Sequence, residues 1–288
     1  MMRARAFAKV NLALAVYPPS ADGYHPLAGI FQSVSLFDTV AVGGASQDQV
    51  TVSNDEAPAD ESNLAFKAVD AVRRLARVTT PMAVDLTKRI PSGAGLGGGS
   101  ADAAAALGLM VERFGVDEEG AADIAESLGS DVPFSYVGGS RQVRGRGERL
   151  TVIEPIDGFA LAIVVPPFSL STPEVFRRWD SLDGPTGEVM PDSALPPRLR
   201  GGLPIRNDLY PAAVAVDARV ADWKDELSAL WGTHVAMTGS GSALFSYFST
   251  LDEARDATDA VALPVRAAEA VEPVDRGWER LPENGTQT

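Results

Sequence analysis

The chain has 288 residues, 45% of them hydrophobic and 22% charged, the proportions of an ordinary globular protein with one large domain or two modest ones. Its formal net charge of −14 argues against a nucleic-acid or anionic-membrane partner, because both require a sizeable basic surface. The sequence has no cysteine and only two histidines, His25 and His234, which excludes disulfides, thiol nucleophiles and zinc–thiolate sites and argues against a histidine-built metal cage. We therefore predict no metal site formed by the protein itself.

The first predicted element is a strand over Ala4–Val16, where every even position is apolar. Arg3, Arg5, Lys9 and Asn11 share its opposite face. Lys9 and Asn11 also interrupt the apolar run, so the segment is not typical of a secretory signal peptide, and no apolar run elsewhere is long enough to predict a transmembrane helix. We therefore expect a cytoplasmic protein.

A turn centred on Asp22 and Gly23 is predicted over residues 17–26. Further strands of the first half are predicted over residues 31–42, 48–53 and 82–90. Helices are predicted over residues 62–77 with Ser62 as N-cap, from about Ser100 to Phe114, and over 117–129. Residues 130–150 are interpreted as a turn, a short strand and a hairpin.

The second half differs in composition, and the change near residue 155 predicts two lobes of an α+β protein. A buried strand is expected over residues 159–167 and a helix from Thr172, followed by a surface loop over 180–204. The remaining expected elements are a long helix over 210–231, a strand, glycine loop and strand over 234–248, a helix over 251–263, a short strand near 265–271 and a frayed tail over 284–288.

The stretch "PSGAGLGGGSADAA", residues 91–104, has five glycines among the seven residues from Gly93 to Gly99. It matches the dinucleotide fingerprint in spacing but lacks the preceding buried strand, and it lacks the lysine of a P-loop before Ser100. Glycines let backbone N–H groups converge, and a helix N-terminus follows at once, which favours a cradle for phosphates. A flexible connector is the alternative interpretation.

Together with "AKVNLALAV" (8–16), "DGYHPL" (22–27), "LGSDVPF" (128–134) and "MTGSGSALF" (237–245), this stretch resembles the motifs of the GHMP kinases, in the same order along the chain. The resemblance implies a lobe like domain 2 of ribosomal protein S5 over residues 1–155 and a ferredoxin-like lobe over 156–288. It implies ATP with Mg²⁺ as phosphoryl donor. Among GHMP kinases, the motifs are most similar to those of members that phosphorylate a cytidine-diphosphate-linked alcohol in non-mevalonate isoprenoid synthesis.

The resemblance also implies catalytic roles. Lys9 would steady Asp131 and the transferring phosphoryl group, and Asp131 would accept or orient the proton of the attacking hydroxyl. The residues implied for ATP, from the adenine end to the phosphates, are Asn63, Pro91, Ser92, Gly93, Ala94, Gly95, Leu96, Gly97, Gly98, Gly99, Ser100 and Ala101.

For the second substrate, the resemblance implies that Tyr24 stacks on the cytosine ring, His25 bonds its edge, and Phe176 covers its other face with Thr172 nearby. The loop over 238–242 would close over the methylerythritol and phosphates. Its implied contacts are Gly239, Ser240 and Gly241, with Asn11 on the side of Lys9.

Several alternatives remain open at this stage. Asn63 and Asp131 have the types and positions of helix-capping or turn residues, and Phe176 is equally consistent with a core position. Phe7 stands where the family usually has proline, Ala101 stands where it usually has a second serine, and the role of Arg146 is open. A sibling kinase of the homoserine or mevalonate type and a nucleotide-binding module without turnover are the competing functions. The sequence does not predict the oligomeric state.

Overall fold

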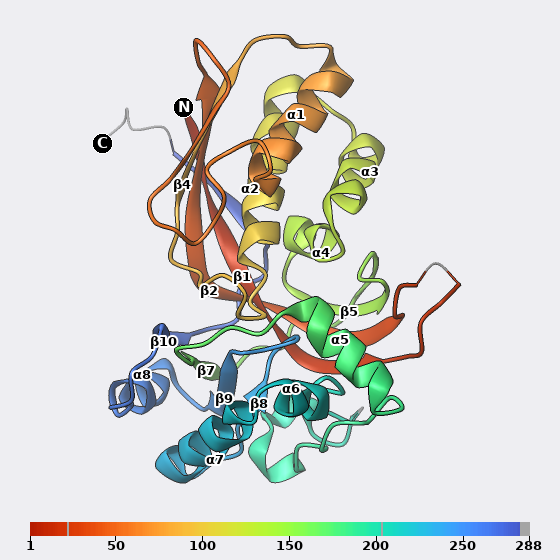
Figure 1. Cartoon of the computed structure of the whole chain (residues 1–288). Helices are drawn as coiled ribbons and strands as arrows, with labels where there is room; N and C mark the ends of the chain where they lie inside the picture. Colours follow the sequence, from red (N-terminus) through yellow and green to blue (C-terminus); the bar gives the residue numbers. More distant parts are fainter. Residues whose placement is uncertain (22, 203, 283–288) are drawn as a thin grey trace.

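The computed structural model describes residues 1–21, 23–202 and 204–282, and these fold into two sheets with helices packed on them (Figure 1). The larger sheet has seven strands within this part of the chain, in the order β11-β1-β2-β4-β3 with β5 and β6 branching from β2. Its strands are β1 (Met2–Val16), β2 (Leu27–Gly44), β3 (Gln49–Val52), β4 (Met82–Thr87), β5 (Ser140–Gly145), β6 (Arg149–Val152) and β11 (Trp278–Leu281).

The long hairpin of β1 and β2 is the spine of this sheet. It pairs from Met2 with Val42 to Val16 with Leu27, with register irregularities between Phe7 and Lys9 and between Asn11 and Ala13. Such irregularities bend a strand and re-aim its side chains, and these two bracket Lys9 and Asn11. Strand β2 is longer than predicted because its first half pairs with β5 and its second half with β4. The predicted turn joins β1 and β2, although Asp22 lies outside the described residues.

Helices cover one face of the larger sheet: α1 (Leu64–Ala76), α2 (Gly98–Phe114), α3 (Glu118–Leu128) and α4 (Val132–Val137) (Figure 1). Buried alanines along α2, from Ala101 to Ala106, let this helix lie close to its neighbours. Two predictions are corrected here. Asn63, not Ser62, is the N-cap of α1, and residues 132–137 form a helix where a turn and a short strand were predicted. Pro133 stands in the first turn of α4, where a missing N–H costs nothing.

The smaller sheet has the order β10-β7-β9-β8 and lies below the first in Figure 1. Its strands are β7 (Ala160–Val165), β8 (Ala236–Met237), β9 (Leu244–Phe248) and β10 (Ala267–Val271), and its helices are α5 (Thr172–Ser181), α6 (Tyr210–Val216), α7 (Arg219–Trp231) and α8 (Leu251–Asp259). Two short 3-10 turns, at Asp192–Ala194 and Pro197–Leu199, lie in the predicted surface loop. The arrangement of helices and mainly antiparallel sheets is α+β, as predicted.

The single helix predicted over 210–231 is wrong, because the chain breaks between α6 and α7. Asp217 is extended, with φ −146° and ψ 106°, and its carboxylate accepts the N–H of Arg219 at 3.1 Å. An aspartate that bonds the backbone two residues ahead competes with helix continuation, which accounts for the break.

Strand β11 was not predicted, and it returns the end of the chain to the larger sheet. It pairs antiparallel with β1, from Arg3 with Leu281 to Ala6 with Trp278. The Trp278 ring lies against α2 at Gly108, where a Cβ would come within 2.2 Å of a ring carbon. The division into lobes 1–155 and 156–288 stays a proposal. In it, the second segment ends with β11, which belongs to the sheet of the first. The predicted fraying of 284–288 falls outside the described residues.

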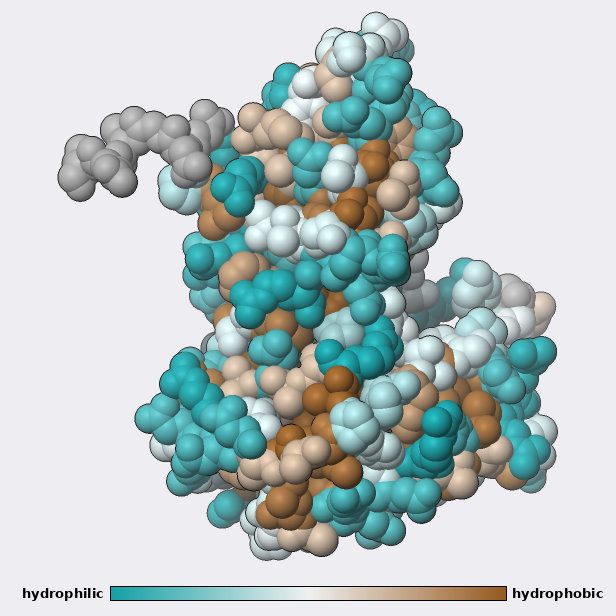
Figure 2. Space-filling model, turned by 60° about the vertical axis from the view of Figure 1, so that its left-hand side comes forward, coloured by the Kyte–Doolittle hydropathy of each residue, from teal (hydrophilic) through white to brown (hydrophobic). Residues whose placement is uncertain are grey.

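Polar side chains cover most of the face drawn in Figure 2, and a group of hydrophobic ones lies exposed in its lower part. Among the residues that the structure describes, no helix combines the length and apolar character needed to cross a bilayer.

Candidate active site

A cleft of about 990 Å³ lies between the elements around the larger sheet and those around the smaller sheet. Its lining comes from β1, the turn after it, the segment before α1, the glycine-rich stretch, the start of α4, the start of α5 and the loop after β8. The predicted site residues that line it are Lys9, Asn11, Tyr24, His25, Asn63, Pro91, Ser92, Gly93, Ala94, Gly95, Leu96, Gly97, Gly98, Gly99, Ser100, Asp131, Thr172, Phe176, Gly239 and Ser240. Segments far apart in sequence thus meet in one place.

Two predicted residues are absent from this lining. Ala101 is fully buried on α2, and Gly241 faces away, since a Cβ there would meet the Met237 sulfur at 2.8 Å and Leu170 at 3.0 Å. Ala101 belongs to the packing of α2, and Gly241 to the packing behind the loop after β8.

The glycine loop, residues 91–99, has the conformation that its composition predicts. Gly93, Gly95 and Gly97 have φ of 60°, 80° and 72°, values that favour glycine. Helix α2 begins at Gly98, two residues earlier than predicted, and Gly97 caps it without a side-chain hydrogen bond. The first N–H groups of a helix have no acceptor within it, so α2 presents its donors and its positive dipole end to the cleft.

Contacts on both sides fix the glycine loop in place. The backbone N–H of Lys9 donates to Leu96 O at 3.0 Å, and Ala243 N–H donates to Ala94 O at 3.1 Å. A Cβ on Gly95 would lie 2.3 Å from Thr238 O, so only glycine lets the two loops approach this closely. A loop clamped between β1 and the loop after β8 does not have the character of a flexible connector.

Lys9 and Asp131 lie together at the floor of the cleft. Lys9 Nζ is 3.4 Å from Asp131 Oδ2 and donates to Asn11 Oδ1 at 2.5 Å, and it lies 5.2 Å from the centre of the Phe31 ring. The lysine is almost completely buried, whereas the Asp131 side chain is 31% exposed. Asp131 stands at the N-cap position of α4 but makes no capping hydrogen bond through its side chain. Its carboxylate is therefore directed to the cleft rather than used to begin the helix.

His25 is held by side chains of α5. Its Nε2 lies 2.8 Å from Asp180 Oδ1, and its ring packs 5.0 Å from Phe176 and 5.5 Å from Trp179, all three on α5. A carboxylate oxygen accepts, so the proton of the neutral imidazole is on Nε2 and Nδ1 is an acceptor. Phe176 is half-buried: it lines the cleft and packs against the hydrophobic cluster behind it.

Tyr24 and Thr172 occupy the rim. The Tyr24 side chain is exposed, and the Arg146 guanidinium lies 4.5 Å from the centre of its ring. Thr172 Oγ1 and Ser240 Oγ are 2.7 Å apart, which joins the start of α5 to the loop after β8. Arg146, whose role the sequence left open, thus lines the cleft beside a predicted substrate residue.

Asn63 is both a cleft residue and a cap. Its Oδ1 accepts from Ala65 N–H at 2.9 Å, and its Nδ2 donates to Pro58 O at 2.7 Å. The side chain is therefore engaged in starting α1, as the capping alternative proposed.

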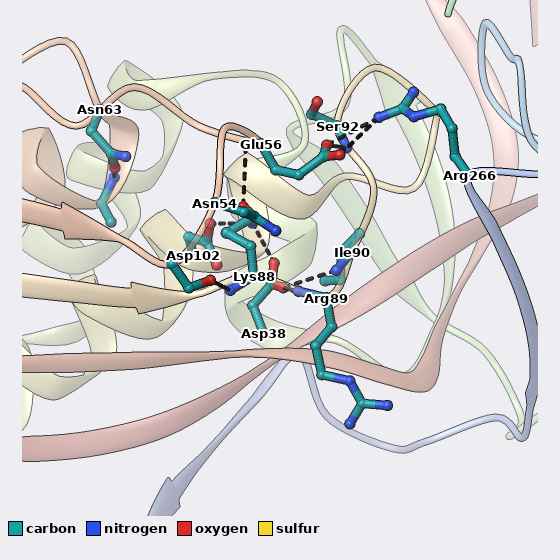
Figure 3. Close-up of polar contacts among 12 residues, drawn as sticks. Asp38, Asn54, Glu56, Asn63, Lys88, Arg89, Ile90, Ser92, Asp102 and Arg266 are labelled. Atoms are coloured by element: carbon teal, nitrogen blue, oxygen red, sulfur yellow. Dashed lines mark hydrogen bonds and ion pairs between the residues drawn. The ribbon is translucent and has the colours of Figure 1, made fainter. Parts of the chain in front are cut away.

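Sequence reasoning missed a buried ionic cluster beneath the glycine loop, made of Asp38, Lys88 and Asp102 (Figure 3). Asp38 comes from β2, Lys88 follows β4, and Asp102 belongs to the first part of α2 and lines the cleft. A signal existed in the sequence, since Asp102 is the one charged residue within the run of alanines that packs α2.

A second missed contact joins the segment before α1 and the start of the glycine loop to the residue that precedes β10 (Figure 3). The Glu56 carboxylate accepts the Ser92 N–H at 2.6 Å and pairs with Arg266 at 3.0 Å. Burial acts to raise the pKa of Glu56, but the hydrogen bonds from Ser92 and Arg266 outweigh it and lower that pKa. Glu56 therefore ties the start of the glycine loop to Arg266, which directly precedes β10 of the smaller sheet.

In the part of the chain that the structure describes, no three histidine, aspartate or glutamate side chains are grouped so that they could hold a metal ion. A magnesium ion that enters with a nucleotide takes most of its ligands from phosphates and water, which asks little of the protein.

Comparison with known proteins agrees with this geometry. The model of the GHMP kinase N-terminal domain matches residues 63–139. The 4-diphosphocytidyl-2-C-methyl-D-erythritol kinase of Pelotomaculum thermopropionicum is 36% identical over 268 residues, 88% of this chain and 92% of that protein. The corresponding kinase of Corynebacterium efficiens is 38% identical over 280 residues, 90% of this chain and 88% of that protein.

Solved structures give the same result. A crystal structure of 4-(cytidine 5'-diphospho)-2C-methyl-D-erythritol kinase superposes with a TM-score of 0.77 at 33% identity, covering 94% of this chain and 99% of that one. Homoserine kinase from Cytophaga hutchinsonii, at 15% identity and a TM-score of 0.68 over 97% of both chains, shares the fold. Fold and cleft together define a small-molecule kinase of the GHMP class. Within that class, the chain belongs to the 4-diphosphocytidyl-2-C-methyl-D-erythritol kinase family.

Proposed function

We propose that this chain transfers the γ-phosphoryl group of ATP to the 2-hydroxyl of 4-diphosphocytidyl-2-C-methyl-D-erythritol, a reaction of non-mevalonate isoprenoid synthesis that takes place in the cytoplasm. The observation that carries the proposal is the Lys9–Asp131 pair, which lies in the same cleft as the glycine loop and the N-terminus of α2. The family relationship supports the choice of acceptor.

The wall of the cleft formed by residues 91–100, here called the phosphate wall, receives ATP. The N–H groups of the first turn of α2 and the positive end of its dipole favour the triphosphate, whose magnesium offsets charge when bound. The bare glycine backbone allows phosphate oxygens to approach without a Cβ between them. The adenine end lies toward Asn63 and Leu64, at the beginning of α1.

Lys9 and Asp131 act where the two substrates meet. Asp131 accepts the hydrogen bond of the acceptor hydroxyl and so aims its oxygen at the γ-phosphorus. As the new oxygen–phosphorus bond forms, the bond from the γ-phosphorus to the oxygen retained by ADP breaks, and the hydroxyl proton leaves through Asp131. The buried Lys9 ammonium, oriented by Asn11, stabilises the charge on the transferring group.

The opposite wall, formed by Tyr24, His25, Phe176 and Asp180 and here called the cytidyl wall, receives the second substrate. Tyr24 and Phe176 offer faces on which a base can stack, and stacking is worth about 1–3 kcal/mol per base. With Asp180 bound to Nε2–H, the His25 Nδ1 is an acceptor, which matches the amino group of cytosine and not the carbonyl oxygen that uracil has in its place.

The direct test is a turnover assay that measures ADP release and the phosphorylated product with the cytidyl acceptor, homoserine and mevalonate. We expect product from the cytidyl acceptor alone. Turnover of homoserine or mevalonate instead would overturn the choice of acceptor, and nucleotide binding without any turnover would favour a binding module. Lys9→Ala should abolish measurable product formation, with Lys67→Ala, an exposed lysine of α1, as the matched control.

A further inference from the structure

The buried cluster of Asp38, Lys88 and Asp102 has no part in the mechanism above, yet it lies directly below the phosphate wall (Figure 3). Lys88 Nζ donates to both carboxylates, with 2.5 Å to Asp102 Oδ2. A Cβ built on Gly98, the first residue of α2, would lie 3.4 Å from Lys88 Nζ. The cluster therefore adjoins the end of the helix at which phosphates are proposed to bind.

The two carboxylates of the cluster are not equivalent. Asp38 has both oxygens engaged, since Oδ2 accepts from Lys88 and Oδ1 accepts the backbone N–H groups of Arg89 and Ile90, the latter at 2.9 Å. Asp102 has only one oxygen engaged, and its Oδ1 is buried without a hydrogen-bond partner in the described structure. The cluster sets two carboxyl groups against the single ammonium of Lys88, so it has one carboxyl group more than it can balance in charge. An ionised Asp102 leaves one uncompensated negative charge in the interior.

Two cations on elements packed against α2 are engaged with other carboxylates. Lys9 of β1 pairs with Asp131 on the cleft side, and Arg73 of α1 pairs with Asp48. Burial raises the pKa of Asp102 to about 7, with Lys88 opposing the rise and Asp38 adding to it. The Asp102 carboxyl also lines the cleft.

We propose that ATP binding is coupled to the uptake of a proton by Asp102. Resting on the proposed function, this inference follows from the charge that the nucleotide brings. A triphosphate placed against α2 adds negative charge next to an interior that already carries one excess carboxylate, and a proton on the orphan oxygen removes that excess. Asp102 is therefore a positioning residue of the nucleotide site, which keeps the floor of the phosphate wall neutral when the phosphates are present.

The test is calorimetric titration with the β,γ-imido analogue of ATP and Mg²⁺ at pH 7.5, in two buffers of different ionisation enthalpy. The difference in apparent enthalpy gives the number of protons taken up. The compared proteins are the wild type, Asp102→Asn and Glu126→Gln, an exposed carboxylate of α3 that serves as the matched control. The titration of the nucleotide itself is common to all three proteins and cancels in the comparison.

We expect the wild type and Glu126→Gln to take up roughly half a proton more than Asp102→Asn when the nucleotide binds. Between pH 6 and pH 8.5, the affinity of the wild type for the nucleotide should fall by about three- to tenfold relative to that of Asp102→Asn. Equal proton uptake in all three proteins overturns the coupling while leaving the proposed function standing. Failure of the wild type to bind the nucleotide overturns both.

Thermal unfolding gives a second readout that does not depend on nucleotide. The folded-state pKa of Asp102 is raised above its unfolded value, so the folded protein holds a proton that the unfolded chain has lost, and stability falls as pH rises toward about 7. Asp102→Asn should therefore lose less melting temperature than the wild type between pH 5 and pH 8. An identical pH dependence in the two proteins would contradict the assignment of the titrating group.

Discussion

The phosphate wall and the cytidyl wall face each other across one cleft but are held in different ways. The phosphate wall is backbone, fixed by hydrogen bonds to β1 and to the loop after β8 and by approaches too close for a side chain at Gly95. The cytidyl wall is made of side chains, several exposed, and its main internal contact is the bond between His25 and Asp180. A wall of backbone tolerates few substitutions of any kind, whereas a wall of side chains changes specificity one residue at a time.

The largest effect is expected where the two walls meet. Asp131→Asn should lower kcat by roughly 10²–10⁴-fold with little change in nucleotide affinity, because the carboxylate acts on the hydroxyl and not on ATP. Single-turnover kinetics and nucleotide titration measure the two quantities. Asp123→Asn, an exposed residue of α3, is the control. A large loss of nucleotide affinity in Asp131→Asn would place this residue in the phosphate wall instead.

The next effect tests the rigidity of the phosphate wall. Gly97 has φ of 72°, and a Cβ there would lie 3.0 Å from Lys9 Cγ, so Gly97→Val displaces both the loop and the lysine. We expect turnover to fall by about 10²-fold, the effect of misplacing reacting groups by about an ångström, together with weaker nucleotide binding. Gly115→Val is a matched control, because Gly115 has φ of 65° with open space around it. Equal losses in both variants would show backbone strain alone at work.

A replacement in the cytidyl wall should change the KM of the cytidyl acceptor and not the KM of ATP. Tyr24→Ala should raise the KM of the cytidyl acceptor by roughly 5- to 150-fold, the value of one stacked base, and leave the KM of ATP unchanged. Steady-state kinetics with each substrate varied in turn gives both constants. Tyr17→Ala, also exposed and outside the cleft lining, is the control. An increase in the KM of ATP alone would assign this rim to the nucleotide.

The smallest expected effect concerns the support of His25. Asp180→Ala removes the acceptor of the His25 Nε2–H group. From the net free energy that such a hydrogen bond contributes, we expect the KM of the cytidyl acceptor to rise roughly two- to tenfold. The ratio of the inhibition constants of uridine monophosphate and cytidine monophosphate, measured by competition with the acceptor, should decrease at the same time. Glu174→Ala on the same helix is the control. An undiminished ratio would mean that the orientation of His25 is set by Phe176 and Trp179 without Asp180.

The sequence predicted those parts of the molecule that rest on local patterns. Alternation located β1 to within two residues, and glycine spacing located the loop whose φ values are positive. It placed Lys9 and Asn11 on one strand face, and they are hydrogen bonded. The roles of the cleft residues came from resemblance and stay predictions. The structure adds their proximity.

Part of what the sequence did not predict depends on partners distant in the chain, and part on local hydrogen bonds. Asp38 and Lys88 are 50 residues apart. No local sequence pattern indicates that the carboxylate of Asp38 in β2 pairs with the lysine that follows β4. The break at Asp217 was missed because this residue's bond to the backbone outweighed the helix propensity of the residues around it. The short helix after Asp131 was missed because Asp131, a turn-forming residue, did not outweigh the helix propensity of the residues that follow it. Both outcomes are decided by a few local hydrogen bonds.

Pairing of β11 with β1 has a consequence for how the protein is made. The outer neighbour of β1 is synthesised more than 260 residues after β1 itself, and the Trp278 ring that packs on α2 comes with it. Until then, β1 has an open edge and α2 lacks one of its packing partners. The larger sheet is therefore complete only once the residues of β11 have been synthesised and have paired with β1.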